Sequence, residues 1–268
     1  MQVTSETIEL DEQPVFLLRA GDEDVPILYL HGVPTSADDW LPFLREGGGV
    51  AVDLPGFGRS GKRGDGDFTV EGWARWVPRL LDALGIERVR LCVHDWGAAG
   101  LVWAAREPHR VVRAAVLNGA PLVGGLPLPR HARVLALPGA GELGVGFATP
   151  RALGRFLRRG MADGAEPDRA WFADVGARFD QGSQRALLRL LRAATPAARE
   201  AAGRALRELA VPTLVAWGGS DPWYPPRNGQ AYAAVLPESE LVELPDAGHW
   251  PWLEDPSLVA RVIAYLHG

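Results

Sequence analysis

The chain of 268 residues places an aspartate where a nucleophile could act. Asp95 lies between a continuous apolar segment, typical of a buried strand, and a helical segment, so we expect it at a sharp strand-to-helix turn. Such a turn needs small neighbours in order to close, and Gly97, Ala98 and Gly100 supply them. The pattern matches the G-x-S-x-G turn that raises a nucleophile above a sheet, with Asp95 in the nucleophile position and Val93 in place of the first glycine. A plain helix N-cap at Asp95 is the inert alternative.

Four segments together resemble the α/β-hydrolase superfamily, and most closely its aspartate-nucleophile branch, the haloalkane dehalogenases and epoxide hydrolases. They are His-Asp-Trp-Gly at 94–97, His-Gly-Val-Pro-Thr-Ser at 31–36 with Trp40 four residues on, Asp-Leu-Pro-Gly-Phe-Gly-Arg-Ser at 53–60, and Ala-Gly-His-Trp at 247–250. The resemblance covers roughly 12–121 and 211–268. It implies an α/β-hydrolase fold with a catalytic triad, and a cap domain inserted between the two covered parts.

A carboxylate nucleophile restricts the reaction. Attack of Asp95 on an ester carbonyl would give an anhydride, which is a poor route to turnover. Attack on a saturated carbon gives a stable alkyl ester, which water then hydrolyses at its carbonyl. The leaving group must therefore depart from a saturated carbon, and a halide or a strained epoxide oxygen suits this requirement. We expect a hydrolase that forms and hydrolyses a covalent alkyl-enzyme ester.

The resemblance assigns the other two members of the triad. His249 follows the last predicted strand and would be the base that activates water in the second step. Asp221 lies in the turn after the strand at 212–217, at the late acid position of the family, and would orient the imidazole. The earlier acid position holds Asn118, which offers no carboxylate, and Asp246 is the nearer but more constrained rival.

Hydrolysis of the ester creates an oxyanion, which needs two hydrogen-bond donors. The backbone N–H groups of Trp96, after the nucleophile, and of Val33, in the His-Gly-x-Pro loop, are expected to supply them. Pro34 would fix that loop, and a cis bond before it fits this role. A structural turn without a catalytic role is the alternative for Val33.

The leaving group depends on the remaining donors in the pocket. The indole of Trp96 resembles a halide-binding tryptophan, and Trp171 is a candidate for the second donor, although a plain packing role in the cap is also open. Epoxide opening would need an acid hydroxyl, which this family draws from cap tyrosines, and none lies within 122–209. Tyr224 could face the pocket from outside the cap. We therefore favour a haloalkane dehalogenase-like activity, with an epoxide hydrolase as the alternative and a non-catalytic binding protein of this fold as a third possibility.

The substrate is expected to be a small apolar organic molecule, with water as the second reactant. Trp250 is a further candidate for substrate contact. Other aromatic residues available to line the pocket are Trp252, Trp223, Phe147, Phe156, Trp171, Phe172 and Phe179. His109 and His131 are predicted to be surface residues.

The elements that must position these residues alternate along the chain. Strand patterns cover 15–18, 25–30, 50–52, 89–93, 114–117, 212–217 and 240–244, and helical patterns cover 70–84, 98–106, 227–236 and 257–266. Continuous apolar strands separated by helices predict an α/β fold with a mostly parallel sheet of about eight strands covered on both faces. The start of the chain is acidic and turn-rich. We expect a core domain at 1–121 and 211–268 and a helical cap domain at 122–210, in which Pro and Gly cluster first.

Composition excludes several classes of protein. The net charge is −5, which argues against a nucleic-acid binder, and the single cysteine, Cys92, excludes a disulfide framework or a multi-cysteine metal site. No run resembles a membrane span or a signal peptide, so a cytoplasmic protein is expected. No cofactor or metal is indicated, and the oligomeric state is open. Residues 122–209 hold 14 arginines against 8 acidic residues, a net of +6, which leaves −11 for the rest of the chain. This basic insertion predicts solvated helix faces or, alternatively, an entrance that attracts anions.

Overall fold

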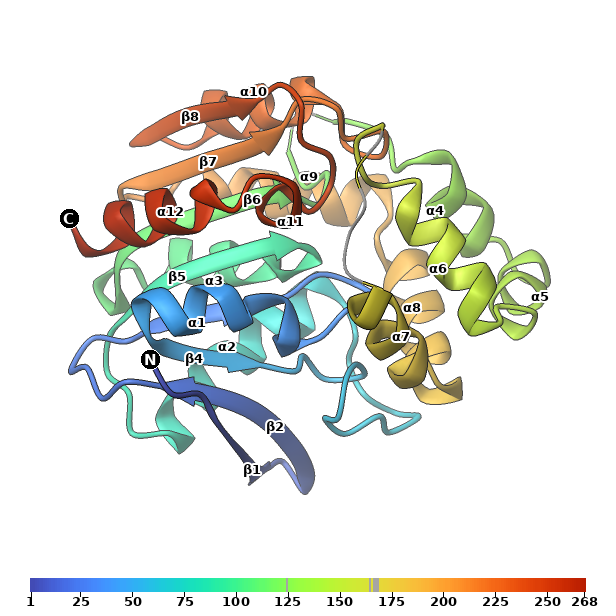
Figure 1. The fold of residues 1–268 in the computed structure, drawn as a ribbon, viewed down its shortest axis with the longest axis horizontal. Helices are drawn as coiled ribbons and strands as arrows, with labels where there is room; N and C mark the ends of the chain where they lie inside the picture. The colour runs from blue at the N-terminus through green and yellow to red at the C-terminus, as the bar shows by residue number, and fades with distance from the viewer. Residues whose placement is uncertain (124, 164, 166–168) are drawn as a thin grey trace.

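A computed structural model describes residues 1–123, 125–163, 165 and 169–268. These residues form one eight-stranded sheet in the order β1-β2-β4-β3-β5-β6-β7-β8 (Figure 1). The strands are β1 (Thr4–Leu10), β2 (Gln13–Ala20), β3 (Ile27–Leu30), β4 (Gly49–Val52), β5 (Val89–Asp95), β6 (Val111–Gly119), β7 (Thr213–Gly218) and β8 (Ser239–Leu244). The predicted α/β-hydrolase sheet is confirmed, and each predicted strand is present within it.

The start of the chain differs from the prediction. The segment interpreted as turn-rich forms β1, which pairs antiparallel with β2, with Glu6 opposite Leu17 and Ile8 opposite Val15. Its residues are exposed or half-buried, because β1 is an edge strand with one free side. Charged side chains such as Glu6 and Glu9 are common on an edge strand, where they oppose pairing with another chain. The acidic pattern that suggested turns is therefore the pattern of a protected edge.

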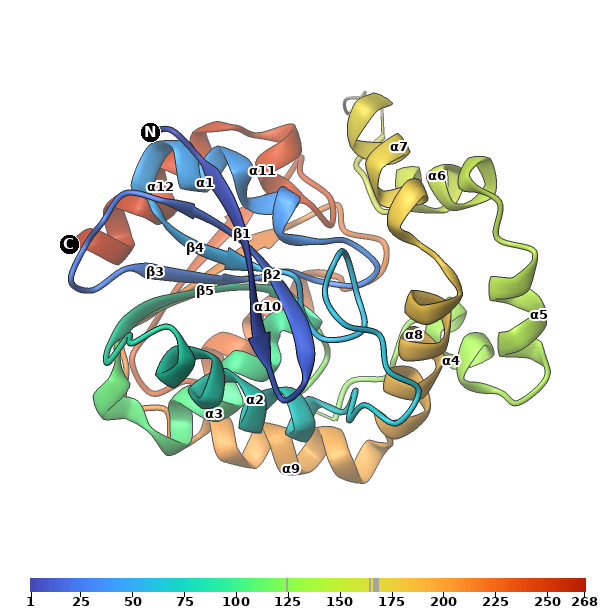
Figure 2. The ribbon, with the colours of Figure 1, turned by 90° about the horizontal axis from the view of Figure 1, so that it is seen from below.

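Six strands that are neighbours in the sheet are mutually parallel, namely β4, β3, β5, β6, β7 and β8. Strand β2 pairs antiparallel with β4. Strands β3, β4 and β7 are buried along their whole length, as expected for a parallel sheet covered on both faces. Helices α1 (Leu41–Gly47) and α12 (Ser257–His267) cover one face, and α2 (Val70–Ala83) and α3 (Ala99–Arg106) cover the other (Figure 2). The body is completed by α10 (Pro226–Val235) and α11 (Pro251–Glu254).

Between β6 and β7 the described residues form helices and no strand. These are α4 (Arg130–Ala136), α5 (Ala140–Gly146), α6 (Pro150–Arg158), α7 (Arg169–Arg178), α8 (Gln181–Ala193) and α9 (Pro196–Leu206). Helices α4 to α8 lie beyond the carboxyl ends of the parallel strands, whereas α9 packs against α3 on the body (Figures 1 and 2). Five residues of the predicted cap lie outside the described part of the chain: Gly124, Gly164, Glu166, Pro167 and Asp168.

Several polar contacts join these helices to loops of the body. Lys62 forms an ion pair with Asp180 at 2.7 Å, and Asp38 forms one with Arg178 at 2.8 Å. The indole N–H of Trp171 donates to Asp39 Oδ1 at 2.9 Å. The helices α7 and α8 are thus held to the body at several points, so the space between them and the sheet has defined walls. None of the described helices combines the length and apolar character that crossing a membrane requires.

Candidate active site

Asp95 is the last residue of β5 and has φ 48° and ψ −122°, a backbone conformation that L-residues rarely adopt. A short 3-10 turn (Trp96–Ala98) and α3 follow at once. The turn passes so close to β3 that a Cβ on Gly97 would lie 2.2 Å from the backbone oxygen of Leu30. Glycine is therefore required at 97, and the predicted strand-to-helix turn at Asp95 is present.

The Asp95 carboxylate is buried, and each of its oxygens has a defined partner. Oδ2 accepts from the Val33 backbone N–H at 2.9 Å, and the Trp96 backbone N–H also donates to the carboxylate. Oδ1 accepts from the Tyr224 hydroxyl at 2.8 Å. Burial raises the pKa of Asp95 above its ordinary value, although the charge of His249 and these donors oppose the rise. The two donors predicted for an oxyanion hole thus converge on the predicted nucleophile.

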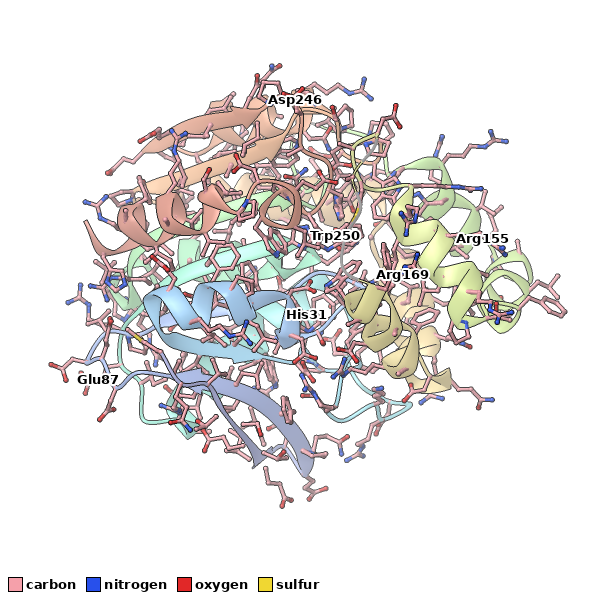
Figure 3. All side chains as sticks on the ribbon, in the orientation of Figure 1. His31, Glu87, Arg155, Arg169, Asp246 and Trp250 are labelled. Carbon is pink, nitrogen blue, oxygen red and sulfur yellow. The ribbon has the colours of Figure 1, made fainter. Side chains whose placement is uncertain are left out.

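The His249 imidazole lies between two carboxylates. Its Nδ1 is 2.8 Å from Asp221 Oδ2, and it shares with Asp95 the wall of one cavity. Burial lowers the pKa of His249, but the carboxylates of Asp221 and Asp95 outweigh burial and raise it above its ordinary value. Asp246, the rival acid, is exposed and lies at the outer edge of the body in Figure 3, away from Trp250.

Asp221 is itself held by three donors. Asn118 Nδ2 donates to Oδ2 at 2.7 Å, while the backbone N–H groups of Trp223 and Tyr224 donate to Oδ1 at 2.8 and 3.0 Å. Asn118 Oδ1 in turn accepts from Gly218 at the end of β7, at 2.9 Å. Sequence reasoning dismissed Asn118 because it lacks a carboxylate. Its place at the end of a strand adjacent to the one that leads to Asp221 is the signal that could have revealed this positioning role.

The backbone of the histidine loop is also fixed. The His249 N–H donates to the Gly160 carbonyl at 2.7 Å, and the His249 carbonyl lies 2.9 Å from His94 Nε2. Glu254 accepts from the backbone N–H groups of both Gly248 and Ala162. His94 thus helps to hold the backbone of His249 in place.

A cavity of about 620 Å³ opens between the body and the helices that follow β6. Asp95, Trp96, Tyr224 and His249 form its end in the body. Apolar side chains dominate the rest of the wall, and these include Val33, Leu135, Val145, Leu153, Phe156, Phe179, Leu187, Leu191 and Trp223. Four of the eight aromatic residues considered for the pocket line it, namely Trp223, Phe147, Phe156 and Phe179.

Two residues predicted to contact the leaving group or substrate do not line this cavity. The Trp171 indole N–H is engaged by Asp39 Oδ1, so it is not free to bind a halide. Trp250 packs behind the imidazole, with its ring centroid 4.7 Å from that of His249 and 5.0 Å from that of Trp171. Figure 3 shows Trp250 and Arg169 where the body meets the helices. In the structure both tryptophans serve packing, which was the alternative for Trp171.

His131 was predicted to be a surface residue, and this is wrong. It is half-buried at the start of α4, lines the cavity, and packs edge-on against Phe156 with ring centroids 4.9 Å apart. Burial, and next the charge of His249, lower the pKa of His131 to about 4. The sequence suggested an exposed position because His131 follows Arg130 in a helical segment. Its burial comes from tertiary contacts with Phe156 of α6 and with Trp223, which the local sequence does not reveal.

Asp39 is a further buried acid that sequence reasoning did not single out. Its side chain is 2% exposed, and Oδ2 has no hydrogen-bond partner. Burial raises the pKa of Asp39 to about 7, against the opposing effect of hydrogen bonds from Thr35 and Trp171. The described residues contain no group of three or more His, Cys, Asp or Glu side chains that could hold a metal ion.

Comparisons with known proteins show which fold family the chain belongs to. The family model of the alpha/beta hydrolase fold matches residues 25–256. A haloalkane dehalogenase of Agrobacterium fabrum is 41% identical over 129 residues, which are 44% of this chain and 42% of that protein. The first curated relatives are matched over only 34–42% of their own length.

Solved structures match over nearly the whole chain. A haloalkane dehalogenase from Bradyrhizobium elkani USDA94 superposes with a TM-score of 0.82 at 25% identity, covering 100% of this chain and 98% of that one. The epoxide hydrolase CorEH superposes with a TM-score of 0.85 at 21% identity, covering 99% of both chains, which shows a shared fold. With the family model matched across most of its length, the chain belongs to the alpha/beta hydrolase fold family.

Proposed function

We propose that the protein is a hydrolase that displaces a halide from a saturated carbon through a covalent ester on Asp95. The observation that carries the proposal is the Asp95 carboxylate, held on a strained turn with Val33 N–H on one oxygen and facing a cavity that also contains His249. Curated relatives named haloalkane dehalogenase support the choice of leaving group. Residues 122–210 would act as the cap that closes the apolar side of the cavity.

In the first step Asp95 Oδ1 attacks the carbon that carries the halide. Oδ1 is the attacking atom because its donor, the Tyr224 hydroxyl, can rotate away, whereas the backbone N–H of Val33 on Oδ2 is fixed. A new C–O bond forms, the carbon–halogen bond breaks, and the halide leaves with the bonding electrons. The Trp96 side chain lines the cavity beside Asp95 and would stabilise the departing anion through its indole N–H.

In the second step a water adds to Cγ of Asp95 while His249 accepts its proton. The negative charge then develops on Oδ2, to which the Val33 N–H already donates, and the Trp96 N–H is a second donor to this group. Esterification removes the charge of Asp95, which is one of the causes that raise the pKa of His249. The imidazole therefore becomes a neutral base more readily at the stage when a base is needed. Asp221 stabilises the imidazolium that results. The tetrahedral intermediate then collapses: the Cγ–Oδ1 bond breaks, the imidazolium returns its proton to the leaving alcohol, and Asp95 loses a proton to become a carboxylate again.

Epoxide hydrolysis is a second candidate, and the Tyr224 hydroxyl favours it. This hydroxyl lies in the cavity and donates to the attacking oxygen of Asp95 at 2.8 Å. When Oδ1 binds carbon, it loses its charge and releases the hydroxyl, which could then protonate an epoxide oxygen. Burial, followed by the charge of Asp95, raises the pKa of Tyr224 well above its ordinary value, so the phenol keeps its proton until a strong base such as an alkoxide forms.

Two matched substitutions separate the candidates. We would measure bromide release from a primary bromoalkane and diol formation from a terminal epoxide of equal chain length. For a dehalogenase, Trp96→Phe should lower bromide release by roughly 10²-fold, the scale of one lost charge-stabilising donor, and Tyr224→Phe should lower it far less. Diol formation by the wild type, without bromide release and with the larger loss in Tyr224→Phe, would overturn the halide assignment in favour of the epoxide.

A further inference from the structure

The cavity has two chemically different walls. Its only described acidic lining residue is Asp95, in the body, while Arg130 and Arg159 line the side formed by the helices after β6. The remaining lining is mainly apolar. A ligand in the cavity therefore meets a negative charge on the wall formed by the body and positive charges on the wall formed by the helices.

The side chains of Arg130 and Arg159 form no hydrogen bond or ion pair within the described part of the chain. Some other arginines of these helices are engaged: Arg192 pairs with Glu142 at 2.7 Å, Arg178 pairs with Asp38 at 2.8 Å, and Arg158 lies over the ring of Phe172. Both Arg130 and Arg159 are exposed at the cavity. The two guanidinium groups thus keep all their donors available for an anionic ligand.

A series of ring contacts connects the helices that carry the two arginines to the catalytic histidine. His131, next to Arg130, packs on Phe156, which lies three residues before Arg159, with ring centroids 4.9 Å apart. Phe156 stacks on Trp223 at 4.9 Å, and Trp223 lies 4.8 Å from the His249 ring. The start of α4 and the end of α6 are therefore fixed next to each other, and an aromatic wall leads from them to the reacting groups.

We propose that the substrate is an amphiphilic anion: an apolar chain with a neutral electrophilic carbon at one end and a carboxylate at the other. The carboxylate binds Arg130 and Arg159, and the chain lies along the aromatic wall. This inference rests on the proposed function and names its substrate class. Repulsion by Asp95 disfavours the reverse orientation, because the carboxylate would then face the nucleophile.

The mouth of the cavity and its size fit such a chain. Val134 is 46% exposed and Phe147 is 77% exposed, yet both line the cavity, so the apolar surface continues to the rim. The volume of about 620 Å³ lies well within the range of small-molecule sites. For an ω-bromoalkanoate the reaction balances as Asp95 displacing bromide and water then releasing the ω-hydroxyalkanoate, with one proton set free.

The test compares ω-bromodecanoate with its methyl ester, which has the same electrophile and a neutral head. The readout is the ratio of kcat/KM values for bromide release. We expect the wild type to prefer the carboxylate and this preference to fall about tenfold in Arg130→Gln or Arg159→Gln and about 100-fold in the double variant, a scale typical of charge-assisted contacts. Arg133→Gln, on the same helix but outside the cavity wall, is the matched control and should keep the preference.

A binding measurement makes the outcome independent of turnover. Decanoate and decanol would be titrated against the intrinsic fluorescence of the tryptophans, two of which line the cavity. Tighter binding of decanoate, lost in the double variant, supports the proposal even if no bromide is released, in which case the proposed function alone fails. Equal binding of decanoate and decanol by the wild type, or an equal preference in the wild type and the double variant, overturns it.

Discussion

The body and the helices α4 to α8 contribute to the same cavity in different ways. In the body, the reacting side chains are held by hydrogen bonds: Asp95 by Val33 and Tyr224, and His249 by Asp221. The helices contribute apolar side chains and two arginines without described partners. The body is thus preorganised for one type of reaction, whereas the helices shape and charge the space that a substrate enters. Chemistry should therefore depend on the body, and substrate preference on the helices.

The largest expected effect is in the body, at the nucleophile. Asp95→Asn should lower activity by roughly 10⁴-fold or more, because an amide cannot form the ester. Asparagine tolerates the positive φ of this position, so the fold should persist. Phe156→Leu in α6 is the counterpart and should change relative rates among substrates while turnover continues. If halide and diol assays show a similar complete loss of activity in both variants, the proposed difference between the body and the helices is wrong.

The next largest effect is expected at Asp221. Asp221→Asn should lower kcat by about 10³- to 10⁴-fold, the scale seen when an acid that orients a catalytic histidine loses its charge. Because Asp221 raises the pKa of His249, the remaining activity should persist to lower pH than in the wild type. A pH–rate profile checks this shift. An acidic limb that stays in place would show that another group sets the protonation of the imidazole.

The contact between the two regions predicts a smaller effect, on stability. The pKa of Asp39 is raised to about 7, so the neutral acid stabilises the folded state. This contribution is lost as the pH rises from the pKa that Asp39 has in the unfolded chain toward 7. The wild type should lose about 2 kcal/mol relative to Asp39→Asn between pH 5 and pH 7. Denaturant unfolding of both proteins at each pH measures this difference.

Neighbouring charges and a control sharpen that measurement. Asp38 with its partners Arg59 and Arg178 lies beside Asp39, and His249 acts on it from the other side. These groups are present in both proteins, so the comparison isolates the carboxyl of Asp39. Asp246→Asn, at an exposed acid, should leave the pH dependence of the wild type in place. A constant difference between the wild type and Asp39→Asn across this range would show that Asp39 stays ionised.

The same contrast explains how much of the molecule the sequence could predict. Buried parallel strands have continuous apolar patterns, and Gly97 and Asp95 mark a turn that few other residues could form, so the sheet and the nucleophile position were predictable. Edge strand β1 was missed because charged edge residues resemble a loop pattern. Asn118, Asp39 and His131 were missed because their roles come from partners about 100 residues away or from another helix, as with the 2.7 Å contact of Asn118 with Asp221. Pattern reasoning detects what a residue does within its own element, and these roles depend on contacts between elements.

The central claim, a covalent ester on Asp95, is tested most directly by trapping it. His249→Gln should form the ester and fail to hydrolyse it, because the base for the second step is absent. After incubation with a primary bromoalkane, mass spectrometry of the Asp95 peptide should show the added alkyl group, and Asp95→Asn combined with His249→Gln should show none. An unmodified Asp95 after incubation with both bromoalkanes and epoxides, or an adduct on another residue, would contradict the account.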